Sequence, residues 1–321
     1  MQQAIISTVA MGCVAVPAGA AVLGSAILRL DSRQAQQQAA QAIHTVNLIT
    51  ASGRLIHQLQ RERSLSIAFM TDTIAAHTLA EQRRDTDRMV TVFSQACADV
   101  DGNPILLAAK DGLISLFQVR QQINDRQLSS AELLRAYSGR IGAVQDLISL
   151  KIKKLTRGKM SRLGTAYVHL LAAKELAGLE RSLLTSALAR DHLDMATRRK
   201  VAEMQDGQTR HLTLFRDHVS QSLYGQCQSI WNHSDERVSQ LRMAVLDETA
   251  SHPLPKPKDW FPVATIRIDA MKRCEEILAE QLLQTAQKHL QTTDQFGRQF
   301  VTIIAASALV AGGMVFFSLG G

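Results

Sequence analysis

Proline and strand-forming patterns are scarce in this chain. Of its 6 prolines, only Pro104 lies between Pro17 and Pro253, so almost nothing in that region interrupts a helix. Alternating runs of β-branched residues and Asn-Gly hairpin turns are also missing, which excludes a sheet-rich fold. Helical periodicity built from Ala, Leu, Gln, Arg and Glu is present instead. The sequence therefore predicts an all-α protein.

Turn signals divide the middle of the chain into eight predicted helices. Four of these signals are DGNP, NDRQLSSAE, LTRGKMS and SHPLPKPKDW, and in the second of them Ser129 and Ser130 are candidate N-caps. Amphipathic helices in this number predict antiparallel bundles, either one large bundle or, as we expect, two four-helix bundles. The predicted helices span about 31–72, 74–100, 104–126, 129–155, 159–190, 194–223, 226–249 and 258–298.

Charge is missing from both ends of the chain. The first 28 residues and the last 23 contain no Asp, Glu, Lys or Arg. The runs 4–28 and 300–319 each exceed the roughly 18 apolar residues of a membrane-spanning helix. A cleaved signal peptide is the alternative for the first run, but no basic segment precedes it and it is long for one. We predict transmembrane helices at 4–28 and 299–321, with a sensor domain at 29–298 between them.

The orientation of such a chain follows from its loops. Two spans would place both termini on one side and residues 29–298 on the other. Arg29 and Arg33 follow the first run and no basic residue precedes it, which alone would keep the middle region inside. Long domains, however, translocate largely regardless of charge. We therefore expect a two-pass protein of the inner (plasma) membrane with a periplasmic or otherwise extracytoplasmic sensor domain.

Aromatic residues and cysteines are also few. Phe, Tyr and Trp make up 4% of the chain, and without basic runs or stacking patterns a nucleic-acid partner is not expected. The net charge of +7, all of it between the neutral ends, fits either a solvated surface or the attraction of anions. Cys97, Cys227 and Cys274 have no CxxC spacing, which supports neither a disulfide framework nor a zinc site.

Catalytic signatures are absent as well. The chain contains no HExxH, Walker loop, GxSxG or CxxCH. His211 and His218 lie seven apart on one helix face, but ordinary core or surface histidines explain them better, because zinc needs more ligands. Acidic residues show no recognisable catalytic pair. We therefore expect no enzyme activity, no metal and no cofactor.

Three arginines stand in the middle of predicted apolar helix faces. Arg63 does so in LQRERSLSIAFM, where the apolar neighbours are spaced three and four residues apart. Arg181 holds the same place in LLAAKELAGLERSLLTSAL, 118 residues later (181 minus 63), within the same string Glu-Arg-Ser-Leu. Arg267 does so in DWFPVATIRIDAMKRCEEIL. The pattern predicts three guanidinium groups directed toward a core, and the repeat favours two related halves.

An inward-facing guanidinium needs a partner, because it is always charged and its burial alone costs several kcal/mol. A small planar oxyanion suits its fork, which offers two parallel charge-assisted hydrogen bonds, and binding would then be coupled to the helix arrangement. Alternatively, the arginines reach the bundle edge or pair with Glu62, Glu175 or Glu180. Convergence of the arginines without a carboxylate would favour a sensor, and one-to-one ion pairs would favour an interaction bundle.

The same segments resemble a known family. LIHQLQRERSLSIAF and LLAAKELAGLERSLL are similar to the signature segments LxHxLQxERGxSxxxL and KExAGxERAxL of the NIT domain, the nitrate- and nitrite-sensing module of bacterial receptors. DWFPVATIRIDAMKRCEEIL resembles the third recurring segment, and the similarity covers most of residues 45–290. The chain departs from the pattern at Ser64, where glycine is usual, and at Ser182, where alanine is common.

The resemblance implies two antiparallel four-helix bundles that bind nitrate or nitrite between helices through arginines. Carried over, it makes Arg63 and Arg181 ligands, with Arg61 as a further candidate beside the first and Arg267 as the candidate on the third segment. It also implies a receptor that signals across the membrane as a homodimer. No output region follows the last apolar run, so the downstream partner is unknown. The alternatives are a bundle sensing another small anion or an organic acid, or a structural or protein-interaction bundle.

Overall fold

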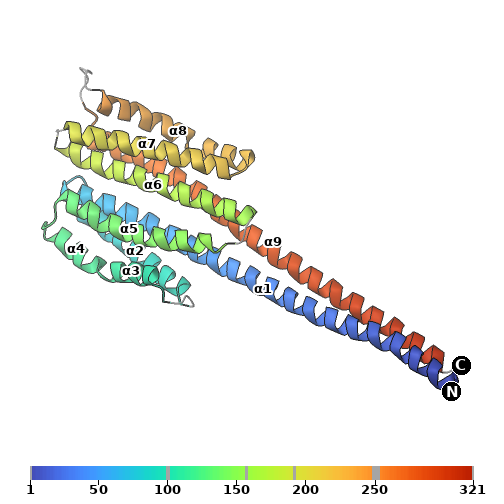
Figure 1. The fold of residues 1–321 in the computed structure, drawn as a ribbon. Coiled ribbons are helices and arrows are strands. Elements are labelled where there is room, and N and C mark those ends of the chain that lie inside the picture. Colours follow the sequence, from blue (N-terminus) through green and yellow to red (C-terminus); the bar gives the residue numbers. More distant parts are fainter. Residues whose placement is uncertain (1, 99–101, 156–157, 191–192, 248–253, 320–321) are drawn as a thin grey trace. The chain divides into compact units, whose positions relative to one another are not determined.

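The structure is a computed structural model, which describes residues 2–98, 102–155, 158–190, 193–247 and 254–319. In these ranges the regular elements are all α-helices, with no strand (Figure 1), which confirms the all-α, helical-bundle prediction. The helices are α1 (Gln2–Met70), α2 (Ala76–Ala96), α3 (Pro104–Ile114), α4 (Leu116–Asn124), α5 (Ser130–Lys153), α6 (Lys159–Ala189), α7 (Met195–His218), α8 (Gln221–Leu246) and α9 (Pro257–Leu319).

The chain divides into two compact units. One consists of Thr45–Leu283, and the other of Met1–His44 together with Gln284–Gly321. The long helices α1 and α9 contribute to both units. The three segments that carry the inward-facing arginines all lie in Thr45–Leu283, so this unit contains the candidate site.

The predicted membrane location is wrong. Across the helices that could be searched, which are those of the described residues, none is long and apolar enough to cross a membrane. The prediction rested on the charge-free runs at the two ends of the chain. The side chains of 4–28 and most of those of 299–321 lie outside the described residues, so the domain boundaries drawn there stay predictions.

Several helices begin where the sequence supplies a cap. The Ser129 hydroxyl accepts a hydrogen bond from the Glu132 backbone N–H (3.3 Å), and the Glu132 carboxylate accepts one from the Ser129 N–H (2.8 Å). This reciprocal capping box selects Ser129 as the cap of α5. At α3 the Asn103 side chain accepts from the Leu106 N–H (2.8 Å), with Pro104 at the first helical position.

The predicted helix at 104–126 is interrupted at Ser115, where α3 ends and α4 begins. The cause lies on α5. The Arg140 guanidinium donates to the Gly112 carbonyl (2.7 Å) and to the Ser115 hydroxyl (2.7 Å). The Arg140 side chain thus satisfies a backbone carbonyl at the end of α3 that would otherwise need a partner in a continuing helix. The helix can therefore be interrupted there.

Buried hydrogen bonds tie α1 to the helices that follow it. Glu62 on α1 is buried, and its carboxylate accepts from Arg120 on α4 (2.7 and 2.9 Å) and from the Tyr137 hydroxyl on α5 (2.8 Å). Gln82 on α2 donates to the side chain of Gln58 (2.7 Å). We call α2–α5, with the part of α1 from Thr45 to Met70, the first helix group.

A second set of bonds joins the remaining helices. Glu180 on α6 is buried and accepts from Arg242 on α8 (2.6 and 2.8 Å) and from Gln208 on α7 (2.8 Å). On α9, the Trp260 indole donates to the Arg181 carbonyl (3.1 Å). We call α6–α8, with the part of α9 up to Leu283, the second helix group. The two groups meet where α1 faces α6 and α9.

Gly53 allows α1 to approach this interface closely, and the replacement Gly53→Ala tests that approach. An added Cβ would overlap the Tyr167 hydroxyl and the Glu275 carboxylate. We expect Gly53→Ala to lower the free energy of unfolding by about 1–3 kcal/mol, although alanine is the better helix former. The measurement is urea denaturation of the two proteins.

Gly139 on α5 is the matched control, because no atom would lie within 4 Å of an added Cβ there. Gly139→Ala should raise the free energy of unfolding by about 0.5–1 kcal/mol through helix propensity alone. If Gly53→Ala stabilised the protein to the same extent, the close approach of α1 would be refuted.

Candidate functional site

The two Glu-Arg-Ser strings lie against each other across the interface. The Ser64 hydroxyl on α1 is 2.8 Å from the Ser182 hydroxyl on α6. These serines are 118 positions apart, the same separation as between Arg63 and Arg181. The sequence repeat therefore corresponds to two helices that face each other with matching serines in contact.

Arg63 is paired with a carboxylate from the opposite helix. Its Nη1 lies 2.5 Å from Glu175 Oε1 and its Nη2 3.2 Å from Glu175 Oε2. Ser138 on α5 accepts a further hydrogen bond from Nη1 (3.0 Å), and Gln60 donates to Glu175 Oε2 (2.7 Å). The positive charge of Arg63 is thus neutralised within the protein.

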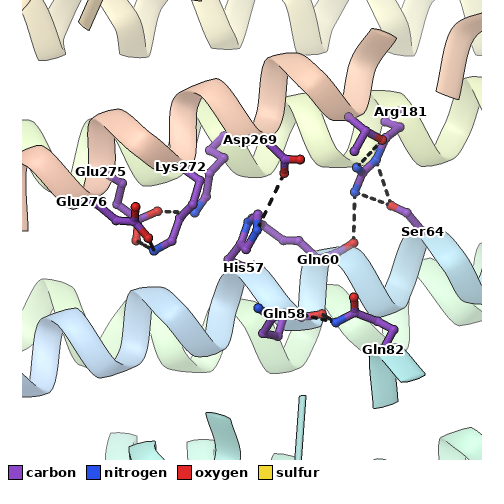
Figure 2. A network of polar contacts seen from close by, with 12 residues as sticks. His57, Gln58, Gln60, Ser64, Gln82, Arg181, Asp269, Lys272, Glu275 and Glu276 are labelled. Atoms are coloured by element: carbon purple, nitrogen blue, oxygen red, sulfur yellow. Dashed lines mark hydrogen bonds and ion pairs between the residues drawn. The ribbon is translucent and has the colours of Figure 1, made fainter. Parts of the chain in front are cut away.

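Arg181 has only neutral acceptors within hydrogen-bonding distance (Figure 2). Its Nη2 donates to the Ser64 hydroxyl (2.9 Å) and the Gln60 carbonyl (3.3 Å), and its Nη1 to the Thr265 hydroxyl on α9 (2.9 Å). The ring of Phe261 lies 5.3 Å from the guanidinium carbon. The side chain is 1% exposed, so a full positive charge is buried without a bonded carboxylate.

The electrostatics of Arg181 reflect this placement. Burial lowers its pKa to about 9, and repulsion from Arg63 and Arg61 adds to that effect, while Asp269 and Glu175 raise the pKa from farther away. The charged form is therefore unfavourable in the site, although it still dominates at neutral pH. An anion that bonded this guanidinium would relieve the destabilisation.

Arg61 stands at the side of the same interface. It is half-buried, and its charge lowers the pKa of both Arg181 and His57. The structure thus brings Arg61, Arg63 and Arg181 within electrostatic reach of one another.

Arg267 faces other helices. Its Nη1 donates to the Gln208 side chain on α7 (2.6 Å), and its Nε donates to Asp235 on α8. Thr265 and Asp269, two positions to either side of it, are α9 residues that face α6 and α1. Helix positions two apart differ in direction by about 200°, so the structure does not bring Arg267 to the other three arginines.

A lysine–glutamate cluster extends the site along α6 and α9 (Figure 2). Lys174 and Lys272 both donate to Glu275, the second at 2.7 Å, and the Tyr167 hydroxyl donates to it at 2.9 Å. Burial raises the pKa of Glu275, but the two lysines outweigh this and lower it to about 2. Sequence reasoning missed this cluster, although Lys174 stands on the same apolar stripe as Arg181.

Taken together, the buried and half-buried side chains of the interface carry more positive than negative charge. Five cationic side chains and three carboxylates contribute, which leaves an excess of two positive charges (five minus three). The cations are Arg61, Arg63, Arg181, Lys174 and Lys272, and the carboxylates are Glu175, Glu275 and Asp269.

His57 lies beside this excess charge and is neutral. Burial, together with repulsion from Lys174 and Lys272, lowers its pKa to about 2. Its Nε2 is 3.8 Å from Asp269 Oδ1, but an uncharged imidazole makes no ion pair at that distance. His57 Nδ1 and Asp269 Oδ1 have no hydrogen-bond partner, so unsatisfied polar atoms remain in the interface.

The other residues considered from the sequence form no such site. His211 Nδ1 lies 3.2 Å from His169 Nδ1, and His218 Nδ1 lies 2.8 Å from the Leu214 carbonyl. In the described part of the chain, no group of three or more His, Cys, Asp or Glu side chains is placed to hold a metal ion. The free, buried cysteines are Cys97, Cys227 and Cys274.

Comparison with known proteins assigns the chain to a family. The model of the NIT family, described as nitrate and nitrite sensing, matches residues 54–283, which is 230 of the 321 residues (283 minus 54, plus one). The protein belongs to the NIT family, and the resemblance found in the sequence is confirmed. The family is thus one of sensing proteins.

A solved structure shares the fold. The structure of the NasR transcription antiterminator superimposes with a TM-score of 0.74 at 20% sequence identity, over 88% of this chain and 80% of that one. At this identity the similarity shows the fold alone. No match was found among curated proteins.

His57 should make the stability depend on pH. The folded imidazole stays neutral with its pKa near 2, whereas in the unfolded chain it binds a proton below pH 6.5. Because the unfolded state then binds more protons, the free energy of unfolding falls as the pH falls below 6.5. We expect His57 to account for a loss of about 2 kcal/mol between pH 8 and pH 5.

Urea denaturation at each pH measures this loss in wild type and in His57→Gln, which should lack the His57 contribution. His233→Gln is the control, because His233 is exposed on α8, and it should keep the wild-type pH dependence. Equal slopes for wild type and His57→Gln would show that the imidazole is not held neutral by burial.

Proposed function

We propose that the protein senses nitrate or nitrite by binding the anion at Arg181, between α1, α6 and α9. One observation carries this proposal. Arg181 is a fully buried guanidinium whose hydrogen-bond partners are Ser64, Thr265 and the Gln60 carbonyl, all of them neutral. The membership of the chain in a nitrate- and nitrite-sensing family supports it.

The chemistry of the site suits a small planar oxyanion. Nitrate and nitrite each present two oxygens that can accept parallel hydrogen bonds from a guanidinium fork. The hydroxyls of Ser64 and Thr265 can rotate and donate to the same anion. The charge of Arg61 adds attraction without a direct bond, whereas that of Arg63 is largely offset by Glu175. We therefore propose Arg181 as the principal ligand, with Arg63 and Arg61 contributing to the affinity.

Arg267 stays a predicted ligand on the sequence argument alone. Its donors already meet Gln208 and Asp235. We expect its replacement to weaken nitrate binding less than that of Arg181. The predicted homodimer and the downstream partner also stay predictions.

Anion binding would bridge three helices that come from both helix groups. Ser64 is on α1, Arg181 on α6 and Thr265 on α9. A ligand that strengthens these contacts favours the helix arrangement in which they form. Because α1 and α9 continue beyond Thr45 and Leu283, a shift of either helix can reach the ends of the chain.

The alternative of an interaction bundle finds support at two of the three arginines. Arg63 pairs with Glu175 and Arg267 with Asp235, as that alternative requires. Glu62 and Glu180 pair with Arg120 and Arg242. Arg181 has no such bonded carboxylate. A sensor of another small anion uses the same guanidinium, and the choice of salts in the experiment separates it from a nitrate sensor.

Thermal unfolding with increasing sodium nitrate or sodium nitrite, against sodium chloride at equal ionic strength, tests the proposal. A ligand at 100 times its Kd adds about 2.7 kcal/mol to the free energy of unfolding. We expect this stabilisation in wild type, and its loss in Arg181→Ala, because the fork that binds the anion is removed. Arg61→Ala and Arg267→Ala should retain part of it.

Arg216→Ala is the control for the loss of an arginine, since Arg216 is exposed on α7 and its side chain is 54% accessible. This variant should be stabilised by nitrate as much as wild type. Equal midpoints in nitrate, nitrite and chloride for the wild-type protein would overturn the proposal.

A further inference from the structure

The two helices carry the string Glu-Arg-Ser-Leu at matching positions of the interface, but they differ at the position six residues before the arginine. Subtracting 118 from Arg181 and Ser182 gives Arg63 and Ser64, and subtracting it from Glu175 gives His57. Arg63 bonds the carboxylate of Glu175 on the opposite helix. The position on α1 that corresponds to Glu175 is occupied by a neutral histidine, and the guanidinium on the opposite helix, that of Arg181, has no bonded carboxylate.

The local surroundings of the two arginines otherwise correspond. Arg181 donates to the Gln60 carbonyl on α1, and the matching position on α6 is Gly178 (60 plus 118). An added Cβ at Gly178 would lie 2.9 Å from Arg63 Nη2, so Arg63 lies beside Gly178 as Arg181 lies beside Gln60. Each guanidinium therefore approaches the opposite helix at the equivalent point.

The Glu175 carboxylate resembles the proposed ligand in shape and charge. It is a planar group with two acceptor oxygens and one negative charge, and both oxygens face the two Nη atoms of Arg63 at 2.5 and 3.2 Å. Gln60 donates to it as well (2.7 Å). Such a fork-to-fork arrangement is what an oxyanion would adopt at a free guanidinium.

We propose that Glu175 is a built-in anion that fills the place at Arg63, so that the interface takes up a single external anion, at Arg181. This inference rests on the proposed function. In it, the residues at positions 175 and 57 determine which of the two arginines binds the external anion. The carboxylate at position 175 occupies the hydrogen-bond donors of Arg63. The neutral side chain at position 57 leaves Arg181 without a carboxylate partner.

A purely structural role of the Arg63–Glu175 ion pair leads to a different prediction. In that case Glu175 only compensates Arg63, and the residue at 57 has no influence on which guanidinium binds the anion. The exchange of the two residues distinguishes the two roles, because it preserves the composition of the interface and moves the carboxylate from one side to the other.

Isothermal titration calorimetry of the full chain with sodium nitrate, at constant ionic strength, tests the inference. His57→Glu should weaken nitrate binding at least 30-fold, because the new carboxylate occupies the place at Arg181. His57→Gln is its neutral control and should bind nitrate within threefold of wild type. The double variant His57→Glu with Glu175→His should recover binding to within tenfold of wild type.

The recovered site should use the other arginine. In the double variant, adding Arg63→Ala should abolish nitrate binding, whereas in wild type Arg181→Ala abolishes it. Glu180→Gln, which removes a buried carboxylate turned toward Arg242, is the control for general damage and should keep Arg181-dependent binding. Circular dichroism of every variant checks that it is folded.

The outcomes separate this inference from the proposed function. Wild type without specific nitrate or nitrite binding overturns both. Wild type that binds through Arg181, together with a folded His57→Glu that binds equally well, overturns only the inference. A folded double variant that still depends on Arg181 also overturns it. If the double variant fails to fold, the His57→Glu result alone decides.

Discussion

The interface between α1 and α6 depends on how the protein accommodates two buried guanidinium groups that face each other. Each carries a charge, and burial first, then repulsion between the two groups, lowers the pKa of Arg181. The protein neutralises one of them with Glu175. The other is held by hydroxyls, a carbonyl and the face of Phe261. These partners stabilise the cation partly, but none of them brings a negative charge to it.

The glutamates that precede the two arginines do not pair with them. Neighbouring positions on a helix point about 100° apart, so Glu62 and Glu180 turn away from Arg63 and Arg181. Each reaches instead into its own helix group, where it accepts from Arg120 or Arg242. The three side chains of Glu-Arg-Ser thus point in three directions. The carboxylate points into its own helix group, the guanidinium points across the interface, and the hydroxyl lies where the two helices meet.

Periodicity was sufficient to predict the helices and the burial of Arg63, Arg181 and Arg267, because an apolar stripe records which face is covered. It does not record which neighbour covers that face, and Arg267 faces α7 and α8 for this reason. The break at Ser115 was equally invisible, since Arg140 on another helix causes it. The predicted helix over 194–223 also ran too far, because α7 ends at His218 and α8 begins after Ser220. The Ser220 hydroxyl accepts from the Leu223 N–H, so this N-cap was a local signal in the sequence.

Two close contacts fix the stretch of α1 that faces Arg181. Toward its N-terminal side, Gly53 lets the helix approach Tyr167 and Glu275, and farther along, Ser64 meets Ser182. These residues are 11 positions apart (64 minus 53), about 16 Å along a helix. His57 and the Gln60 carbonyl lie between them, on the stretch of α1 that faces Arg181 and α9. Both ends of that stretch are held against the opposite helices, so the anion that we propose at Arg181 would meet a part of α1 whose position is fixed on either side.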